Sequence, residues 1–265
     1  MPFMNFPELH EDLDIIKFYN LIDRYELKQL SNIITEINPT MDTLLYLSKF
    51  LNSESSIEGN TSFKKTNSYF ENFYKNSLIL KKTADNILDL NALDFHCCTL
   101  NLSNINLVSS VKNVVYSFEN VIKNKEVVLE FNNNINKNFF ACDNNKLQKI
   151  IFNLIYNSVK YTNKNDKIIV SINEKDEKKY ICVEDTGIGI PSNELPQIFN
   201  KFFQGSVHTT EMDNGTGIGL FIVNKFVKVL DGKIYVYSKL NKGTKIMIEL
   251  PSFLVEKPFK KLVKF

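Results

Sequence analysis

The spacing of apolar residues changes near residue 95, and this change predicts two domains. From about Asp12 to Leu51, and again from about Ser68 to Asp94, apolar residues recur every three or four positions, as on one face of a helix. The segment between them, 52–62, is rich in Ser, Asn and Glu and is typical of a loop. Pro39 should bend the first helix because its ring removes a backbone donor. Residues 1–94 are therefore predicted to form a helical hairpin.

After residue 95 the pattern becomes the alternation of β-strands, interrupted by helical segments. The expected strands are Thr99–Leu102, Glu126–Phe131, Phe139–Cys142, Lys167–Ile172, Tyr180–Glu184, Lys233–Ser238 and Thr244–Leu250. The expected helices are Asn106–Lys123, Asn144–Tyr161 and Ile218–Leu230. The predicted fold class is α+β: the hairpin is followed, over residues 95–253, by an α/β sandwich in which three helices back a mixed sheet. Residues 254–265 form a basic tail that we expect to be solvated or loosely docked.

A lone hairpin leaves part of its apolar stripe uncovered. Pairing with a second hairpin into a four-helix bundle would cover that stripe, so the sequence predicts a homodimer. The alternative, in which the hairpin packs back on the second domain of its own chain, stays open.

The charge balance and the apolar runs of the chain argue against two classes of protein, those that bind nucleic acid and those that span a membrane. The chain has 32 Lys and Arg against 30 Asp and Glu, so it lacks the basic field of a nucleic-acid-binding protein, and we expect no nucleic-acid partner. No apolar run is long enough for a transmembrane segment, and the first residues carry acid where a signal peptide needs base. We expect a cytoplasmic protein with reduced cysteines, which are Cys97, Cys98, Cys142 and Cys182.

Three polar positions share one face of the helix expected at Asn144–Tyr161. Asn153, Asn157 and Lys160 are four and three positions apart, which places them a turn from one another on the same side. Amide oxygens are neutral ligands suited to Mg²⁺ that already bridges phosphates, and a lysine ammonium suits a phosphate oxygen. An asparagine-rich helix without such a role is the alternative for this feature alone.

Two glycine-rich segments follow in order. Asp185 ends an expected strand and is followed by Gly187 and Gly189, which allow a flat ligand to approach the backbone, while the carboxylate can accept a hydrogen bond from an exocyclic amine. Gly217 and Gly219 open the last expected helix, whose free amides and dipole favour phosphate. Together with the asparagine helix, these segments predict an ATP pocket.

Residues 95–251 resemble the catalytic ATP-binding domain of sensor histidine kinases, within the GHKL-type group that includes Hsp90, MutL and type II topoisomerase ATPases. The motifs that carry the resemblance are Asn153–Thr162, Asp185–Pro191, Ile198–Gln204, Gly215–Leu220 and Lys242–Thr244. The run Lys160–Thr162 and the phenylalanine-rich motif at 198–204 point to the histidine kinases among these groups.

The resemblance implies a role for each matching residue. Asn157 would coordinate Mg²⁺ with support from Asn153, and Lys160 would contact phosphate. In the rest of the pocket, the implied contacts are Tyr161 beside adenine, Asp185 at the adenine amino group, Gly187 and Gly189 below the base, Gly217 and Gly219 at the phosphates, and Thr244 closing the base pocket. Residues 205–214 resemble the mobile segment that covers the nucleotide in the family. The implied cofactors are ATP and Mg²⁺.

The hairpin resembles the dimerisation and phosphoacceptor module of the same family, but it lacks the acceptor. No histidine lies between Glu11 and Phe95. In the best register Thr35 occupies the histidine position and Glu36 that of the adjacent acid, which could act as a base. A threonine hydroxyl is a poor nucleophile without such activation. The histidines elsewhere are His10, His96 and His208.

These features predict a histidine-kinase-like signalling protein that binds Mg-ATP and acts in a two-component phosphorelay, with a response regulator or another phosphorelay protein as its partner. It would be an enzyme of the ATP-dependent protein histidine kinase family in which Thr35 makes self-phosphorylation doubtful. The alternative is a non-catalytic dimeric scaffold that binds a response regulator or another kinase, with ATP in a structural or gating role. An ATPase of the Hsp90 or MutL kind is disfavoured by the phenylalanine-rich motif and the position of the hairpin.

Overall fold

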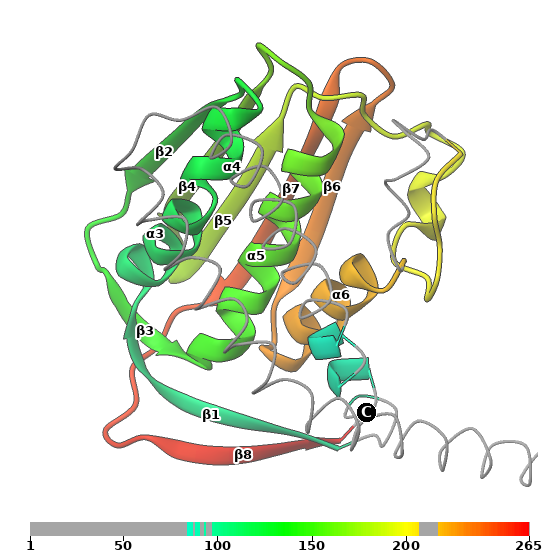
Figure 1. Cartoon of the computed structure of the whole chain (residues 1–265). Helices are drawn as coiled ribbons and strands as arrows, with labels where there is room; N and C mark the ends of the chain where they lie inside the picture. Colours follow the sequence, from blue (N-terminus) through cyan, green and yellow to red (C-terminus); the bar gives the residue numbers. More distant parts are fainter. Residues whose placement is uncertain (1–83, 87, 91–92, 94–96, 207–216, 265) are drawn as a thin grey trace, which may run out of the picture. The chain divides into compact units, whose positions relative to one another are not determined.

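The computed structural model describes residues 84–86, 88–90, 93, 97–206 and 217–264 (Figure 1). The chain divides into two compact units, Met1–Asp94 and Phe95–Phe265. The described residues of the first unit are helical and fall within the helix expected from Ser68 to Asp94. The rest of the predicted hairpin, its four-helix bundle and the positions Thr35 and Glu36 lie outside the described residues.

The second unit is built on a mixed five-stranded sheet with the order β2-β4-β5-β7-β6. Its strands are β2 (Val128–Asn134), β4 (Lys167–Lys175), β5 (Lys178–Asp185), β6 (Lys233–Lys239) and β7 (Gly243–Pro251). Strands β2 and β4 are parallel, and the other neighbours are antiparallel. The sheet is therefore mixed, as the sequence predicts.

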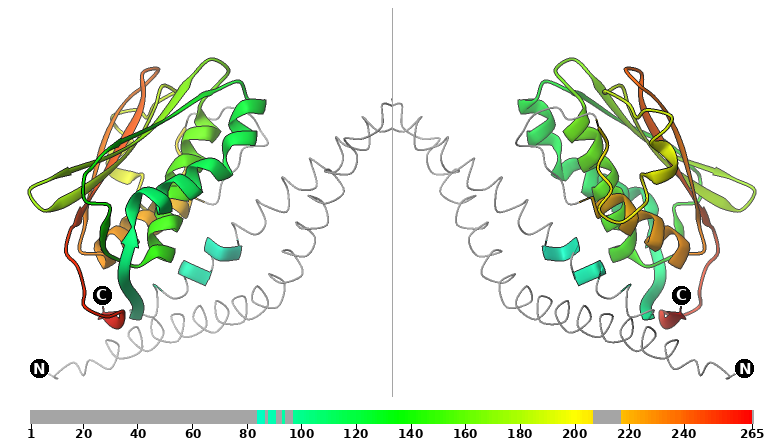
Figure 2. Two further views of the ribbon diagram at one scale, coloured as in Figure 1. Left: turned by 90° about the vertical axis from the view of Figure 1, so that its left-hand side faces the viewer. Right: turned by 90° about the vertical axis from the view of Figure 1, so that its right-hand side faces the viewer.

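Helices cover one face of this sheet, as Figures 1 and 2 show. They are α3 (Leu107–Ser117), α4 (Glu119–Asn124), α5 (Asn144–Tyr161) and α6 (Gly219–Val229). Helix α5 packs between α3 and α6 and against the sheet, so its apolar side chains form the centre of the core. The predicted α/β sandwich is confirmed.

The alternation of side chains between the two faces of strand β5 positions the site. Along β5, alternate side chains are buried on the helix-covered face: Lys179, Ile181, Val183 and Asp185. The antiparallel register sets Ile168 of β4 on one side of Asp185 and Thr244 of β7 on the other. Because directly opposed residues point to the same face, the Asp185 carboxylate is directed into the core beneath α5.

A second, three-stranded sheet has the order β3-β1-β8, formed by β1 (Cys97–Asn106), β3 (Phe139–Cys142) and β8 (Phe259–Lys264). The expectation of a solvated or loosely docked tail is wrong for β8, which pairs antiparallel with Cys97–Leu102. The reason is that β3 pairs only with Ser103–Asn106, which leaves the backbone groups of the first half of β1 for the tail to bond.

Two other elements depart from the sequence prediction. The helix expected at Asn106–Lys123 breaks into α3 and α4 at Phe118, which is buried and contacts the ring of Phe152 at a centroid distance of 4.9 Å. A short 3₁₀ helix, Leu195–Gln197, follows the glycine-rich loop after β5. Within the described ranges, no helix has the length and apolar character needed to cross a membrane.

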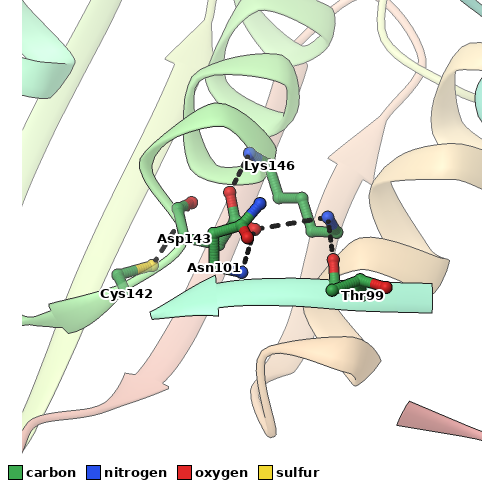
Figure 3. A network of polar contacts seen from close by, with 5 residues as sticks. All are labelled: Thr99, Asn101, Cys142, Asp143 and Lys146. Carbon is green, nitrogen blue, oxygen red and sulfur yellow. Dashed lines mark hydrogen bonds and ion pairs between the residues drawn. The ribbon is translucent and has the colours of Figure 1, made fainter. Parts of the chain in front are cut away.

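Asp143 joins β1 to the start of α5 (Figure 3). Its carboxylate is the N-cap of α5, accepting the Lys146 amide at 3.1 Å, and it also accepts the Asn101 amide of β1 at 2.9 Å. The Lys146 ammonium lies 3.3 Å from the same carboxylate and donates to the Thr99 carbonyl at 2.8 Å. Asp143 is only 2% exposed, so these contacts are largely shielded from water.

We expect Asp143→Ala to lower the free energy of unfolding by about 2 kcal/mol, because it removes a helix cap and leaves the Asn101 amide without its acceptor. Asp143→Asn keeps an oxygen for the cap and should cost less. Urea denaturation of the full chain, followed by far-UV circular dichroism, measures both. The exposed Glu256 provides the control variant Glu256→Ala. An unchanged midpoint for Asp143→Ala would contradict this account.

Candidate functional site

The Asp185 carboxylate is held by three donors from three parts of the second unit. The Ser158 hydroxyl of α5 donates to Oδ2 at 2.9 Å. The amides of Gly187 and Thr244 donate to Oδ1 at 3.1 Å and 3.2 Å. An ionised carboxylate has about four acceptor positions, so the donors among the described residues leave one position, on Oδ2, for a further donor.

The Asp185 residue is buried, with an exposure of 8%. Burial raises the pKa of Asp185 above its ordinary value, while the hydrogen bonds from Ser158, Gly187 and Thr244 act in the opposite direction. The site therefore holds a carboxylate whose charge depends on the donors around it.

The loop after Asp185 is fixed at both ends by close backbone approach. A Cβ at Gly187 would lie 2.3 Å from the Tyr161 carbonyl oxygen, and one at Gly189, where φ is +69°, would lie 2.1 Å from the Lys239 carbonyl oxygen. The Ile188 amide donates to that Tyr161 oxygen at 3.1 Å. Glycine is therefore required at both positions, and the loop lies between the end of α5 and the β6–β7 turn.

The β6–β7 turn contributes two further contacts to this loop. A Cβ at Gly243, where φ is +95°, would lie 1.9 Å from the Asp185 carbonyl oxygen. The Ser238 hydroxyl accepts the Ile190 amide at 2.8 Å and lies 2.8 Å from the Thr244 hydroxyl. Thr244 thus lies beside Asp185, and its amide donates to the Asp185 carboxylate.

The second part of the site lies where α5 meets α6. Asn153 is 4% exposed, and its amide nitrogen donates to the Lys149 carbonyl at 3.0 Å. Its Oδ1 is buried and has no hydrogen-bond partner among the described residues. A Cβ at Gly219 would lie 3.0 Å from this oxygen, so the first residue of α6 packs directly on Asn153.

The N-cap residue of helix α6 is Ile218, whose side chain makes no cap hydrogen bond to the amides of the first turn. Just before it, Gly217 has a φ of +67°, and a Cβ there would lie 2.5 Å from the carbonyl carbon of Phe202. The phenylalanine-rich turn and the helix start are therefore in contact. The preceding residues 207–216, including His208, lie outside the described part of the chain, as do His10 and His96.

Asn157 and Lys160 are half-buried on the later turns of α5. The Lys160 ammonium lies 5.0 Å from the centre of the Tyr161 ring. Asn157 immediately precedes Ser158, the residue that contacts Asp185. One helix therefore carries residues of both parts of the site: Asn153 faces the start of α6, and Ser158 faces Asp185, about 7.5 Å farther along the axis.

Sequence reasoning assigned no role to Ser158 or Ser238. A signal for Ser158 is present, because Leu147, Ile151, Leu154 and Ser158 follow steps of four, three and four along α5. A small polar residue at a core-facing position of that stripe needs a buried partner. Nothing comparable marks Ser238, which lies on β6 and acts through the turn that follows it.

Comparison with known sequences agrees with the fold described above. Residues 142–253 match the family of histidine kinase-, DNA gyrase B-, and HSP90-like ATPases. Histidine kinase P4 of Formosa agariphila is 29% identical over 188 residues, which cover 67% of this chain and 14% of that protein. Sensor protein SrrB of Staphylococcus aureus is 34% identical over 115 residues, which cover 43% of this chain and 20% of that protein. The matched part is thus a fifth or less of these relatives' length.

Solved structures share the fold. The catalytic domain of histidine kinase ThkA is 26% identical with a TM-score of 0.51, over 57% of this chain and 95% of that domain. Full-length ShkA, solved in complex with AMPPNP, is 19% identical with a TM-score of 0.63, over 88% of this chain and 47% of that one. The second unit of this chain is therefore similar to the ATPase domains of the histidine kinase-, DNA gyrase B-, and HSP90-like family, and sensor histidine kinases are among its relatives.

Proposed function

We propose that this chain binds Mg-ATP in its second unit and acts as a histidine-kinase-like protein in two-component signalling. The observation that carries the proposal is the Asp185 carboxylate, which is buried, held by three donors and left with one open acceptor position. A single N–H from the amino group of adenine would fill that position. Guanine carries a carbonyl oxygen at the equivalent place, which a carboxylate repels.

The asparagine pair fits magnesium and phosphate. A buried amide oxygen without a partner is costly to the fold, and Asn153 Oδ1 has none among the described residues. Asn157 would coordinate Mg²⁺ with support from Asn153, while Lys160 and the uncapped start of α6 would contact phosphate. No cluster of three or more His, Cys, Asp or Glu is found among the described residues, so the proposed Mg²⁺ would take its ligands from amides and from the nucleotide. Bound Mg²⁺ would neutralise charge on the phosphates.

The proposed homodimer and the response-regulator partner rest on the resemblance of the first unit to the family's phosphoacceptor module. That unit has Thr35 where the family pattern has histidine. The chain on its own is therefore expected to bind ATP without transferring phosphate to itself, and to act as an ATP-gated regulator or on a histidine of another protein.

Calorimetry on the full chain tests nucleotide binding. We expect ATP and ADP to bind more tightly with Mg²⁺ than with a chelator. Asn157→Ala should weaken Mg-ATP binding by at least about tenfold and remove the dependence on Mg²⁺, because a metal ligand is lost. Asn145→Ala is the matched control, since Asn145 is exposed near the other end of the same helix. Absence of heat with every nucleotide would overturn the proposal.

The turn at Gly243 should be needed for the same binding. Gly243→Ala forces a Cβ against the Asp185 backbone at a φ of +95°, so we expect it to destabilise the fold by about 2 kcal/mol and to weaken ATP binding at least about tenfold. Gly205→Ala is the control, because its Cβ would meet only the end of the Glu194 side chain. Thermal unfolding and calorimetry measure the two effects. Wild-type values for Gly243→Ala would show that this contact does not shape the site.

Phosphate transfer can be followed with γ-labelled ATP. We expect the isolated chain to take up no label, and Asp185→Asn to serve as the variant with impaired binding. Acid-labile label on His10, His96 or His208 would make one of them the acceptor, and acid-stable label on Thr35 would make the threonine the acceptor. ATP binding with no transfer to the chain or to a histidine-containing partner would favour the non-catalytic scaffold.

A further inference from the structure

Of the three donors on Asp185, two are backbone amides and one is a side chain. The amides of Gly187 and Thr244 are fixed by the loop and by the β5–β7 register. The Ser158 hydroxyl is the side-chain donor, and both it and Asp185 are buried, at 5% and 8% exposure. A substitution at residue 158 can therefore change the hydrogen bonding of the carboxylate without altering either amide.

The two oxygens of the carboxylate are held differently. Oδ1 accepts both amides, while among the described residues Oδ2 accepts only the Ser158 hydroxyl. Oδ2 is therefore the oxygen with an open acceptor position and also the oxygen on which a proton would settle. When Oδ2 is ionised, the Ser158 hydroxyl can donate a hydrogen bond to it. When Oδ2 carries a proton, that O–H is itself a donor, and the Ser158 oxygen must accept instead.

We infer that Ser158 holds Asp185 as an ionised hydrogen-bond acceptor and thereby sets the preference of the site for adenine over guanine nucleotides. The inference rests on the proposed ATP binding. With Ser158 donating, Oδ2 presents a lone pair to the amino group of adenine. Without that donor, a proton on Oδ2 would offer a hydrogen to the carbonyl oxygen of guanine, and the preference would fall. Ser158 is a positioning residue, because it acts through Asp185.

The described residues around Asp185 leave the Ser158 hydroxyl as the side-chain group that opposes protonation of the carboxylate. Ile168, directly opposite on β4, is fully buried and offers no hydrogen bond. Among the described residues, Asp166, just before β4, acts on Asp185 through its charge, and this negative charge also favours protonation of Asp185. The contacts from α5 and β7 are the neutral Ser158 hydroxyl and Thr244 amide. Removing the Ser158 hydroxyl takes away the shortest of the three hydrogen bonds that oppose protonation of Asp185.

The direction of the pH effect follows from these contacts. Burial raises the pKa of Asp185, and adenine binding needs the ionised form, so ATP affinity should fall as the pH drops through that pKa. Loss of the Ser158 donor raises the pKa further, so the fall should begin at a higher pH. A hydrogen bond to a charged group corresponds to a shift of about one pH unit.

The test compares full-length wild type with Ser158→Ala by calorimetry with Mg-ATP and Mg-GTP between pH 5 and 9. We expect the midpoint of the ATP affinity profile to move up by about one pH unit and the ATP-over-GTP preference near that midpoint to fall about tenfold. Ser110→Ala is the matched control: Ser110 is also buried and donates to a side chain, Asn144 Oδ1, at 2.7 Å, but makes no contact with Asp185. It should keep the wild-type profile.

Failure of the inference is distinct from failure of the proposed function. If wild type binds no nucleotide at any pH, the proposed function fails. If wild type binds and Ser158→Ala lowers affinity equally at every pH, or leaves the profile unchanged, Ser158 has only a packing role and the inference is overturned. Carbon-13 NMR of the Asp185 carboxyl in nucleotide-free protein, assigned with Asp185→Asn, gives a second readout. An unchanged titration midpoint in Ser158→Ala would also overturn the inference.

Discussion

A carboxylate buried at the end of the central strand is the constraint on which this domain depends. A charge removed from water is costly unless donors surround it, and the chain provides those donors from α5, from the loop after β5 and from the start of β7. Each donor fixes the place of the segment that carries it. Asp185 therefore determines where three segments distant in sequence meet.

The two parts of the site are prepared for a ligand to different degrees. Around Asp185 the polar groups are almost fully satisfied, and the glycines at 187, 189 and 243 pack backbone against backbone. At the junction of α5 and α6 the Asn153 amide oxygen lacks a hydrogen-bond partner among the described residues, and α6 begins without a side-chain cap from Ile218. The part of the site around Asp185 is thus satisfied by the fold itself, while the part around Asn153 has a buried polar atom that a ligand could still satisfy.

Much of this arrangement could be predicted from the sequence, because it depends on periodicity. Helix α5 has the predicted bounds, since Asp143 caps it and its apolar stripe runs through every turn. Strand alternation places Asp185 on the buried face. The tail strand β8 could not be foreseen, because its pairing depends on how much of β1 is left uncovered by β3. The break at Phe118 could not be foreseen from the sequence either, because it depends on contacts with α5.

The contacts also separate residues that serve the fold from residues that serve a ligand. The Gly187 amide donates to Asp185, and Gly243 packs on the Asp185 backbone, so the fold itself requires these residues and their presence alone does not prove nucleotide binding. Asn153 differs, because its buried oxygen has no partner among the described residues, and an apolar side chain there would avoid a penalty of about 1–3 kcal/mol. A fold does not gain from such a group. Its place beside the uncapped start of α6 is therefore the stronger argument that the domain binds phosphate and its metal ion.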